Sequence, residues 1–184
     1  EVTDPNTVPV TLISLYLAGF NVVELKFPEN AAAKVRDSVE EARRLLLGLE
    51  IVEEASDYMV LHVFSTDEAP VEVLIRNMGR LARTMYFDVV RGLRCRDLGV
   101  LRGVEIKEND LDRLYFFTVR SIRKAASAPS LTLIPETIAR LIDLRIAAKI
   151  IEEIGDQADR AAGEAIKIIE SEAETDFVDS LNAC

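Results

Sequence analysis

The sequence predicts a mainly α-helical fold. It consists of a small α+β unit over residues 1–66, an antiparallel three-helix bundle over residues 67–172, and a frayed acidic tail over residues 173–184. Two patterns predict this. From residue 71 onward, apolar residues recur at spacings of three and four through three long stretches, as on helices that bury one face. Before residue 66, runs rich in β-branched and aromatic residues alternate with short helical patterns.

The first unit is expected to have the order α-β-α-β-β. The first helix has Pro9 in its first turn and ends at Gly19, both favoured positions for these residues. The last two runs are joined by the short polar segment 55–57, which is typical of a β-hairpin. His62, the only histidine, falls in the last strand, where we expect a packed or solvent-facing side chain. The expected elements are a helix over 8–18, a strand over 21–27, a helix over 31–47, and strands over 51–54 and 58–64.

The three long stretches predict the helices of the bundle. Residues 65–68 form a helix-start signature before the first, Asp97 can cap the second, and Pro135 opens the third. Residues 127–130 break the pattern between the second and third. Three long amphipathic helices with short links favour successive antiparallel hairpins, an arrangement like that of spectrin.

Composition excludes several classes of protein. The formal net charge of -10 and the pI of about 4.7 argue against nucleic acid as the main partner and favour divalent cations. No apolar run approaches the roughly 20 residues that span a bilayer. Cys95 and Cys184 are far apart, and we expect two free thiols in a reducing cytoplasm. The chain begins at Glu1 without a methionine, as a processed or truncated protein would.

Pairs of carboxylates at helical spacing are the main candidate site. Glu152 and Asp156 lie one turn apart on the third helix, and Glu108 and Asp112 have the same spacing on the second. In an antiparallel hairpin the two pairs lie near the same level, because they are equally distant from the link. Asp88 of the first helix sits at the margin of its buried stripe and could reach the same region.

Carboxylates that converge from facing helices form the kind of oxygen cluster that holds hard divalent or iron-type cations. Like charges about 4 Å apart repel by roughly 4 kcal/mol at an effective dielectric constant near 20, and a bound metal removes that repulsion. Spacing alone also permits the alternative that these carboxylates are only solvated.

A family resemblance favours the metal. Residues 151–159 read IEEIGDQAD and resemble the ERIGD-x-A-D signature of the PhoU family, regulators of phosphate uptake, with Glu153 where the family usually has arginine. The sequence MGRL at 78–81, followed by Asp88, resembles the family's first helix. The sequence ENDLD at 108–112 matches its other acidic element, E/D-x-x-x-D. Together these elements cover residues 70–172 in the family's order.

The resemblance implies a three-helix domain whose E/D-x-x-x-D motifs bind iron, zinc, manganese or magnesium. It also implies a non-enzymatic, cytoplasmic negative regulator that links a phosphate ABC transporter to a sensor kinase. By position, the implied metal ligands are Glu108, Asp112, Glu152 and Asp156, with Asp88 and Asp159 as further candidates. No catalytic or other cofactor-binding residue is implied.

The chain departs from the family pattern in two ways. Bacterial members carry two three-helix units in tandem, whereas this chain has one, so we expect a homodimer to supply the second. Residues 1–66 look more like the middle region of archaeal members, which often follows an AbrB-like DNA-binding domain. No such domain is visible, so DNA binding is expected only through a domain outside this chain.

Two other classes remain open. One is a carboxylate-bridged di-metal enzyme of the ferritin type, although those bundles usually carry E-x-x-H motifs and no histidine lies on the three predicted bundle helices. The other is a dimerisation or interaction module of a transcription regulator, with no metal site.

Overall fold

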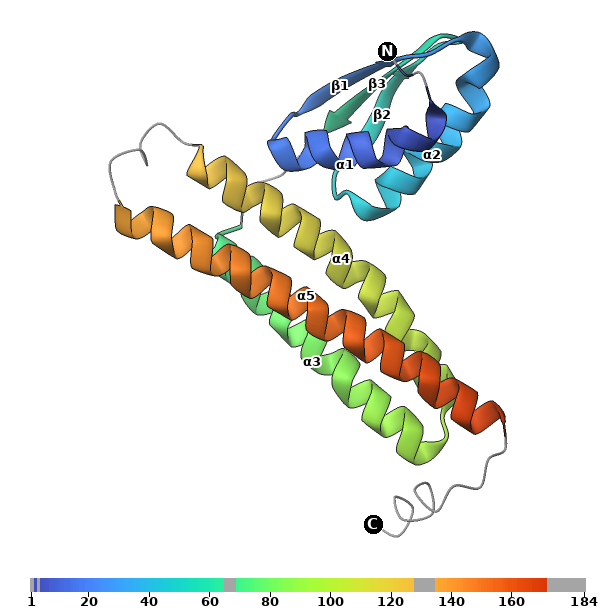
Figure 1. Ribbon diagram of the computed structural model, residues 1–184, viewed down its shortest axis with the longest axis vertical. Coiled ribbons are helices and arrows are strands. Elements are labelled where there is room, and N and C mark those ends of the chain that lie inside the picture. The colour runs from blue at the N-terminus through green and yellow to red at the C-terminus, as the bar shows by residue number, and fades with distance from the viewer. Residues whose placement is uncertain (1, 3, 65–68, 128–134, 172–184) are drawn as a thin grey trace.

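The computed structural model describes all residues except 1, 3, 65–68, 128–134 and 172–184. Within the described residues, the order α-β-α-β-β followed by three long helices is confirmed (Figure 1). The predicted helix-start signature at 65–68 and the predicted tail lie outside the described residues. The regular elements are α1 Val8–Ala18, β1 Val22–Lys26, α2 Ala32–Leu45, β2 Leu49–Glu54, β3 Tyr58–Val63, α3 Val71–Cys95, α4 Leu98–Ala126 and α5 Pro135–Glu170, with 3-10 turns at Pro5–Thr7 and Glu29–Ala31.

The first unit is a three-stranded antiparallel sheet in the order β1-β3-β2, with α1 and α2 against it (Figure 1). The predicted hairpin is confirmed as β2 and β3, and α1 ends at Gly19 in the left-handed conformation. Alternation along β3 buries Met59, Leu61 and Val63, so one face of the sheet packs on the helices. His62 lies on the other face, opposite Val22 of β1 and Glu50 of β2.

Gly48, which follows α2, is required by two features of the backbone. Its φ is +78°, and a Cβ placed there would lie 2.4 Å from the carbonyl oxygen of Phe64.

We therefore expect Gly48→Ala to lower the free energy of unfolding by about 2–4 kcal/mol, combining left-handed strain with a backbone clash. Urea denaturation checks this value. Gly163→Ala is the matched control: this glycine lies in α5 with nothing within 4 Å of its Cβ position. An equal loss in both variants would contradict the explanation.

The three long helices pack pairwise into a bundle, with α4 antiparallel to both neighbours (Figure 1). Contacts between helices fix the position of each helix along the bundle axis. Arg102 near the start of α4 pairs with Glu170 at the end of α5 at 3.1 Å. The Thr118 hydroxyl lies 3.4 Å from the Met78 sulfur, which joins α3 to α4. The core is formed mainly by Met, Leu, Val and Ala side chains. Among the described residues, no helix is both long and apolar enough to cross a membrane.

Arg120 of α4 joins the bundle to the first unit. It is 1% exposed, and its guanidinium lies 4.7 Å from the centre of the Tyr16 ring. It donates to the carbonyl of Tyr16, to the carbonyl of Gly19 at 3.4 Å and to the side chain of Asn21 at 2.6 Å. The carbonyls of Tyr16 and Gly19 belong to the last turn and C-cap of α1, where a cation is favoured by the helix dipole.

Candidate metal centre

A close approach of α4 and α5 brings the acidic pairs together. Gly155 of α5 faces Leu111 of α4: a Cβ on Gly155 would lie only 2.2 Å from the Cδ2 atom of Leu111. The absence of a side chain at residue 155 therefore lets the two helices approach closely. Asp156 and Asp112 follow these two residues directly in sequence, so the contact sets both carboxylates at one level of the bundle.

Glu108, Asp112 and Asp156, here called the acidic cluster, each offer one oxygen, and the three oxygens lie within 4.8 Å of one another. All three side chains are half-buried. Within the described residues, neither Glu108 nor Asp112 forms an ion pair, and Asp156 is 3.7 Å from Arg160 of its own helix. The cluster therefore concentrates acidic groups, with Arg160 beside Asp156 and Lys149 acting on Asp112 as the compensating charges.

This concentration raises the pKa values of the cluster's carboxyl groups. Burial, followed by the charges of Asp112 and Asp159, raises the pKa of Glu108 to about 7. Burial and the charges of Glu152 and Asp156 raise the pKa of Asp112. A carboxyl group that resists ionisation is one whose charged form lacks a stabilising partner, and a bound cation would supply that partner.

Glu152 has a cation of its own. Lys149, one turn before it on α5, forms an ion pair with Glu152 and lies 3.6 Å from Glu153. Glu152, Glu153 and Asp156 form a second group of oxygens within 4.8 Å, although Glu153 is exposed. Lys149 therefore stands on the α5 side of the cluster, and Asp156 belongs to both groups.

The two weaker candidates behave differently. Asp88 forms ion pairs with Lys107 at 3.1 Å and with Arg91 at 3.2 Å and is not part of the acidic cluster. Asp159 lies close enough to the acidic cluster for its charge to raise the pKa of Glu108. Burial raises the pKa of Asp159 itself. The structure thus brings the oxygens of three of the six sequence candidates within 4.8 Å of one another. Glu152 and Asp159 lie next to this cluster.

Two nearby residues were not among the sequence candidates. Glu153 completes the second group, and its signal in the sequence was its position between Glu152 and Asp156, where the family usually has arginine. Lys149 was hidden because its pairing with Glu152 at a spacing of three resembles an ordinary surface ion pair.

The cluster predicts how the stability of the metal-free protein depends on pH. Since the pKa of Glu108 is about 7 in the folded protein and 4.5 ordinarily, the folded state binds more protons between these values. Stability therefore falls as pH rises through this window. Glu108→Gln is expected to flatten that fall and to be more stable by about 1 kcal/mol at pH 8, after allowance for solvent screening.

Chemical denaturation in EDTA from pH 4.5 to 8 measures this effect. Glu164→Gln is the control, because Glu164 is an exposed carboxylate of α5 that pairs with Lys167. A pH profile of Glu108→Gln that coincides with that of the wild type would contradict the assignment.

The donor set fits a hard cation. The cluster consists of carboxylate oxygens only, which suit magnesium, manganese or iron better than a soft metal. The three side chains are half-buried, so they remain in contact with solvent, which would complete the coordination. Glu108, Asp112 and Asp156 would hold the ion, with Glu152 beside it. The single histidine lies in β3, outside the bundle helices.

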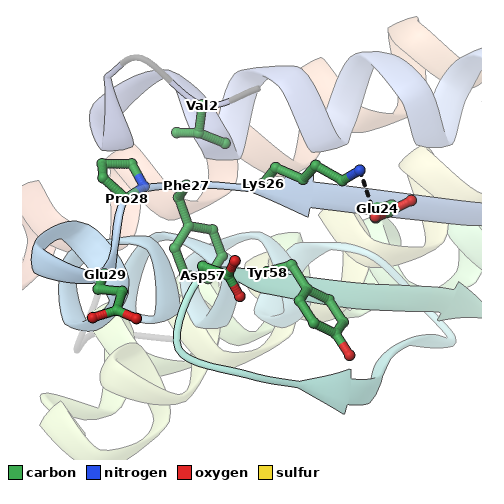
Figure 2. A pocket seen from close by; sticks show the side chains of 8 residues that line it. All are labelled: Val2, Glu24, Lys26, Phe27, Pro28, Glu29, Asp57 and Tyr58. Atoms are coloured by element: carbon green, nitrogen blue, oxygen red, sulfur yellow. Dashed lines mark ion pairs between the residues drawn. The ribbon is translucent and has the colours of Figure 1, made fainter.

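A hollow of about 900 Å³ lies elsewhere, at the end of the sheet. Figure 2 shows that its charged side chains do not converge. Lys26 reaches Glu24 at 3.3 Å, while Glu29 lies at the opposite end of the hollow. Lys26 and Glu24 are both more than half exposed, so their ion pair is weak. The acidic cluster therefore remains the better candidate site.

Comparison with known proteins adds one finding. The model of the PhoU domain matches residues 75–165, a range that begins in α3, ends in α5 and contains the whole acidic cluster. No curated protein and no solved structure matches the chain.

Proposed function

Because residues 75–165 place this chain in the PhoU family, we propose that it is a non-enzymatic regulator of phosphate uptake whose acidic cluster binds a metal ion. The family is regulatory and is associated with phosphate transport. The matched residues run from α3 to α5 and include the cluster residues of α4 and α5, which supports assigning the family's role to this part of the chain.

The observation that carries the metal proposal is the convergence of Glu108, Asp112 and Asp156 from two helices. Glu108 and Asp112 are neighbours through their spacing on α4, and the approach of Asp156 from α5 is what tertiary packing adds. The carboxylates thus face each other across α4 and α5, at a direct cost in repulsion. A cation of the magnesium, manganese, zinc or iron type would offset that cost and stabilise the helix pair.

We assign the ion a structural or sensory role. This assignment follows the regulatory role of the family. Lys149 is the neighbouring cation, and it is held by Glu152 and Glu153. The ferritin-type enzyme remains the less favoured class, because the acidic cluster has no histidine.

The proposed partners follow from the family role. They are a second copy of this chain and, in the cytoplasm, the ATPase of a phosphate ABC transporter or its sensor kinase. Contact with DNA would require a further domain. The competing proposal, an interaction module of a transcription regulator, needs no metal and no effect on phosphate.

A phosphate-uptake assay tests the function. Deleting the gene is expected to leave phosphate uptake high in phosphate-rich medium, and the wild-type gene is expected to restore repression. The Asp112→Asn, Asp156→Asn double variant shows whether repression needs the metal. Uptake that stays repressed after deletion would remove the regulatory proposal, whatever the purified protein binds.

A further inference from the structure

The outward face of α5 carries a row of isoleucines that its own bundle does not cover. They recur every four residues, and each is between 43% and 56% exposed. A scattered exposed isoleucine needs no explanation, but a continuous row on a helix that faces solvent does. The row consists of Ile138, Ile142, Ile146, Ile150 and Ile154.

The spacing of the row makes it suited to a second helix of the same kind. Side chains four apart form a ridge inclined to the helix axis, and two such ridges pack together when the helices cross at about -50°. The row is symmetric about Ile146. When two copies of α5 run antiparallel and cross at this residue, Ile142 of one copy lies beside Ile150 of the other. Ile138 and Ile154, about 12 Å along the axis from the crossing point, lie at the edge of the contact.

The charges of α5 favour the same antiparallel orientation. The first half, 135–150, carries Arg140, Arg145 and Lys149 against Glu136 and Asp143, whereas the second half, 151–170, carries six acidic residues against Arg160 and Lys167. Arg140 and Arg145 are already engaged within the chain, by Glu72 and Tyr115. An antiparallel pair sets the weakly basic half of each helix against the acidic half of the other. It also sets Asp143 of each copy level with Lys149 of the other, since both are three residues from Ile146. A parallel pair would align like charges.

The exposed area is of the right order for an isologous interface. The isoleucine row alone offers roughly 400 Å² of apolar surface per copy, about half of what one partner buries in a standard interface. Tyr86 and Phe87 of α3 are 59% and 61% exposed. They follow Met85, whose side chain lies 3.6 Å from the Cβ position of Gly155, so they stand at the level where the row ends.

We propose that this chain forms an antiparallel homodimer through the isoleucine row of α5, with its twofold axis near Ile146. The proposal specifies the second copy named in the proposed function. The dimer proposal does not depend on the metal or on phosphate. If it fails, the metal site and the regulatory function are still decided by their own experiments.

Ile146→Glu is the decisive variant, because the twofold axis brings both new carboxylates together in an apolar interface. We expect the wild-type protein to be a dimer and the variant a monomer, with the dissociation constant raised at least about 100-fold. Ile142→Glu is expected to act in the same direction. Both positions are more than half exposed, so the fold should persist, and circular dichroism checks that it does.

Ile106→Glu is the matched control. Ile106 lies on α4, is 68% exposed and is outside the row, so this variant is expected to remain a dimer. Sedimentation velocity from about 1 to 100 μM protein measures all four chains. The proposal is overturned by a monomeric wild type at the highest concentration, by a dimer that survives Ile146→Glu, or by an equal loss in Ile106→Glu.

Disulfide crosslinking tests the orientation in a chain whose Cys95 and Cys184 are replaced by serine. Ile146→Cys is expected to crosslink to itself across the twofold axis, whereas Ile154→Cys is not, because an antiparallel pair separates the two copies of residue 154. Efficient crosslinking at both positions would indicate a parallel pair and would contradict the proposed orientation.

Discussion

Replacing both Asp112 and Asp156 by asparagine is expected to abolish divalent-cation binding and, in the absence of metal, to stabilise the fold. Two of the three oxygens that converge belong to these residues. Their loss should weaken binding at least about 100-fold, because affinity for hard cations depends on the number of charged ligands. Without metal, the same change removes like-charge repulsion, and we expect a gain of about 1–2 kcal/mol.

The opposite signs of these two effects identify the site. A carboxylate that only supported the fold would, when replaced, lower stability with and without metal. Calorimetric titration with manganese and thermal unfolding in EDTA measure the two effects. Asp110→Asn is the matched control, since Asp110 lies on α4 between the cluster residues but is exposed. Manganese affinity equal to that of the wild type in the double variant would remove the metal site.

Replacing Arg120 by methionine is expected to lower the free energy of unfolding by about 3 kcal/mol, the second large effect. Methionine keeps much of the volume but leaves the carbonyls of Tyr16 and Gly19 and the side chain of Asn21 without this donor. Hydrogen bonds from a charged group contribute about 1.5–3 kcal/mol each, and buried polar atoms left without a partner carry a further cost.

The measured effect should be a fall of about 6–12 °C in Tm for a chain of this size. Arg123→Met, on an exposed position of the same helix, is the control and is expected to change stability by less than about 0.5 kcal/mol. Because Arg120 joins α4 to the end of α1, the lost stability should come from a weakened contact between the first unit and the bundle. A Tm unchanged in Arg120→Met would contradict this role.

Local sequence signals were enough for most of the fold. Gly19 ended α1 as predicted, and the side chain of Asp97 caps α4 by accepting from the amide of Val100. The polar segment 55–57 joins β2 and β3. These features depend on backbone conformation and on hydrogen bonds within a few residues, so the sequence carries them directly. The boundaries between the predicted domains remain a prediction.

Only part of the candidate site could be predicted from such local sequence signals. Spacing placed Glu108 with Asp112, and Glu152 with Asp156, on the same sides of their helices. It could not show that Lys149 holds Glu152 or that Lys107 holds Asp88, because such pairs depend on side-chain positions and, for Lys107, on a neighbouring helix.

The sequence by itself determined the order of elements, the apolar faces of the helices and the acidic pairs, because these follow from local propensity and periodicity. Only the tertiary structure decided which carboxylates meet. The contact between Gly155 and Leu111 sets the distance and level of α4 and α5, and a shift of one turn would separate Asp112 from Asp156. Burial and opposing charge arise from that packing, since both depend on residues distant in the chain.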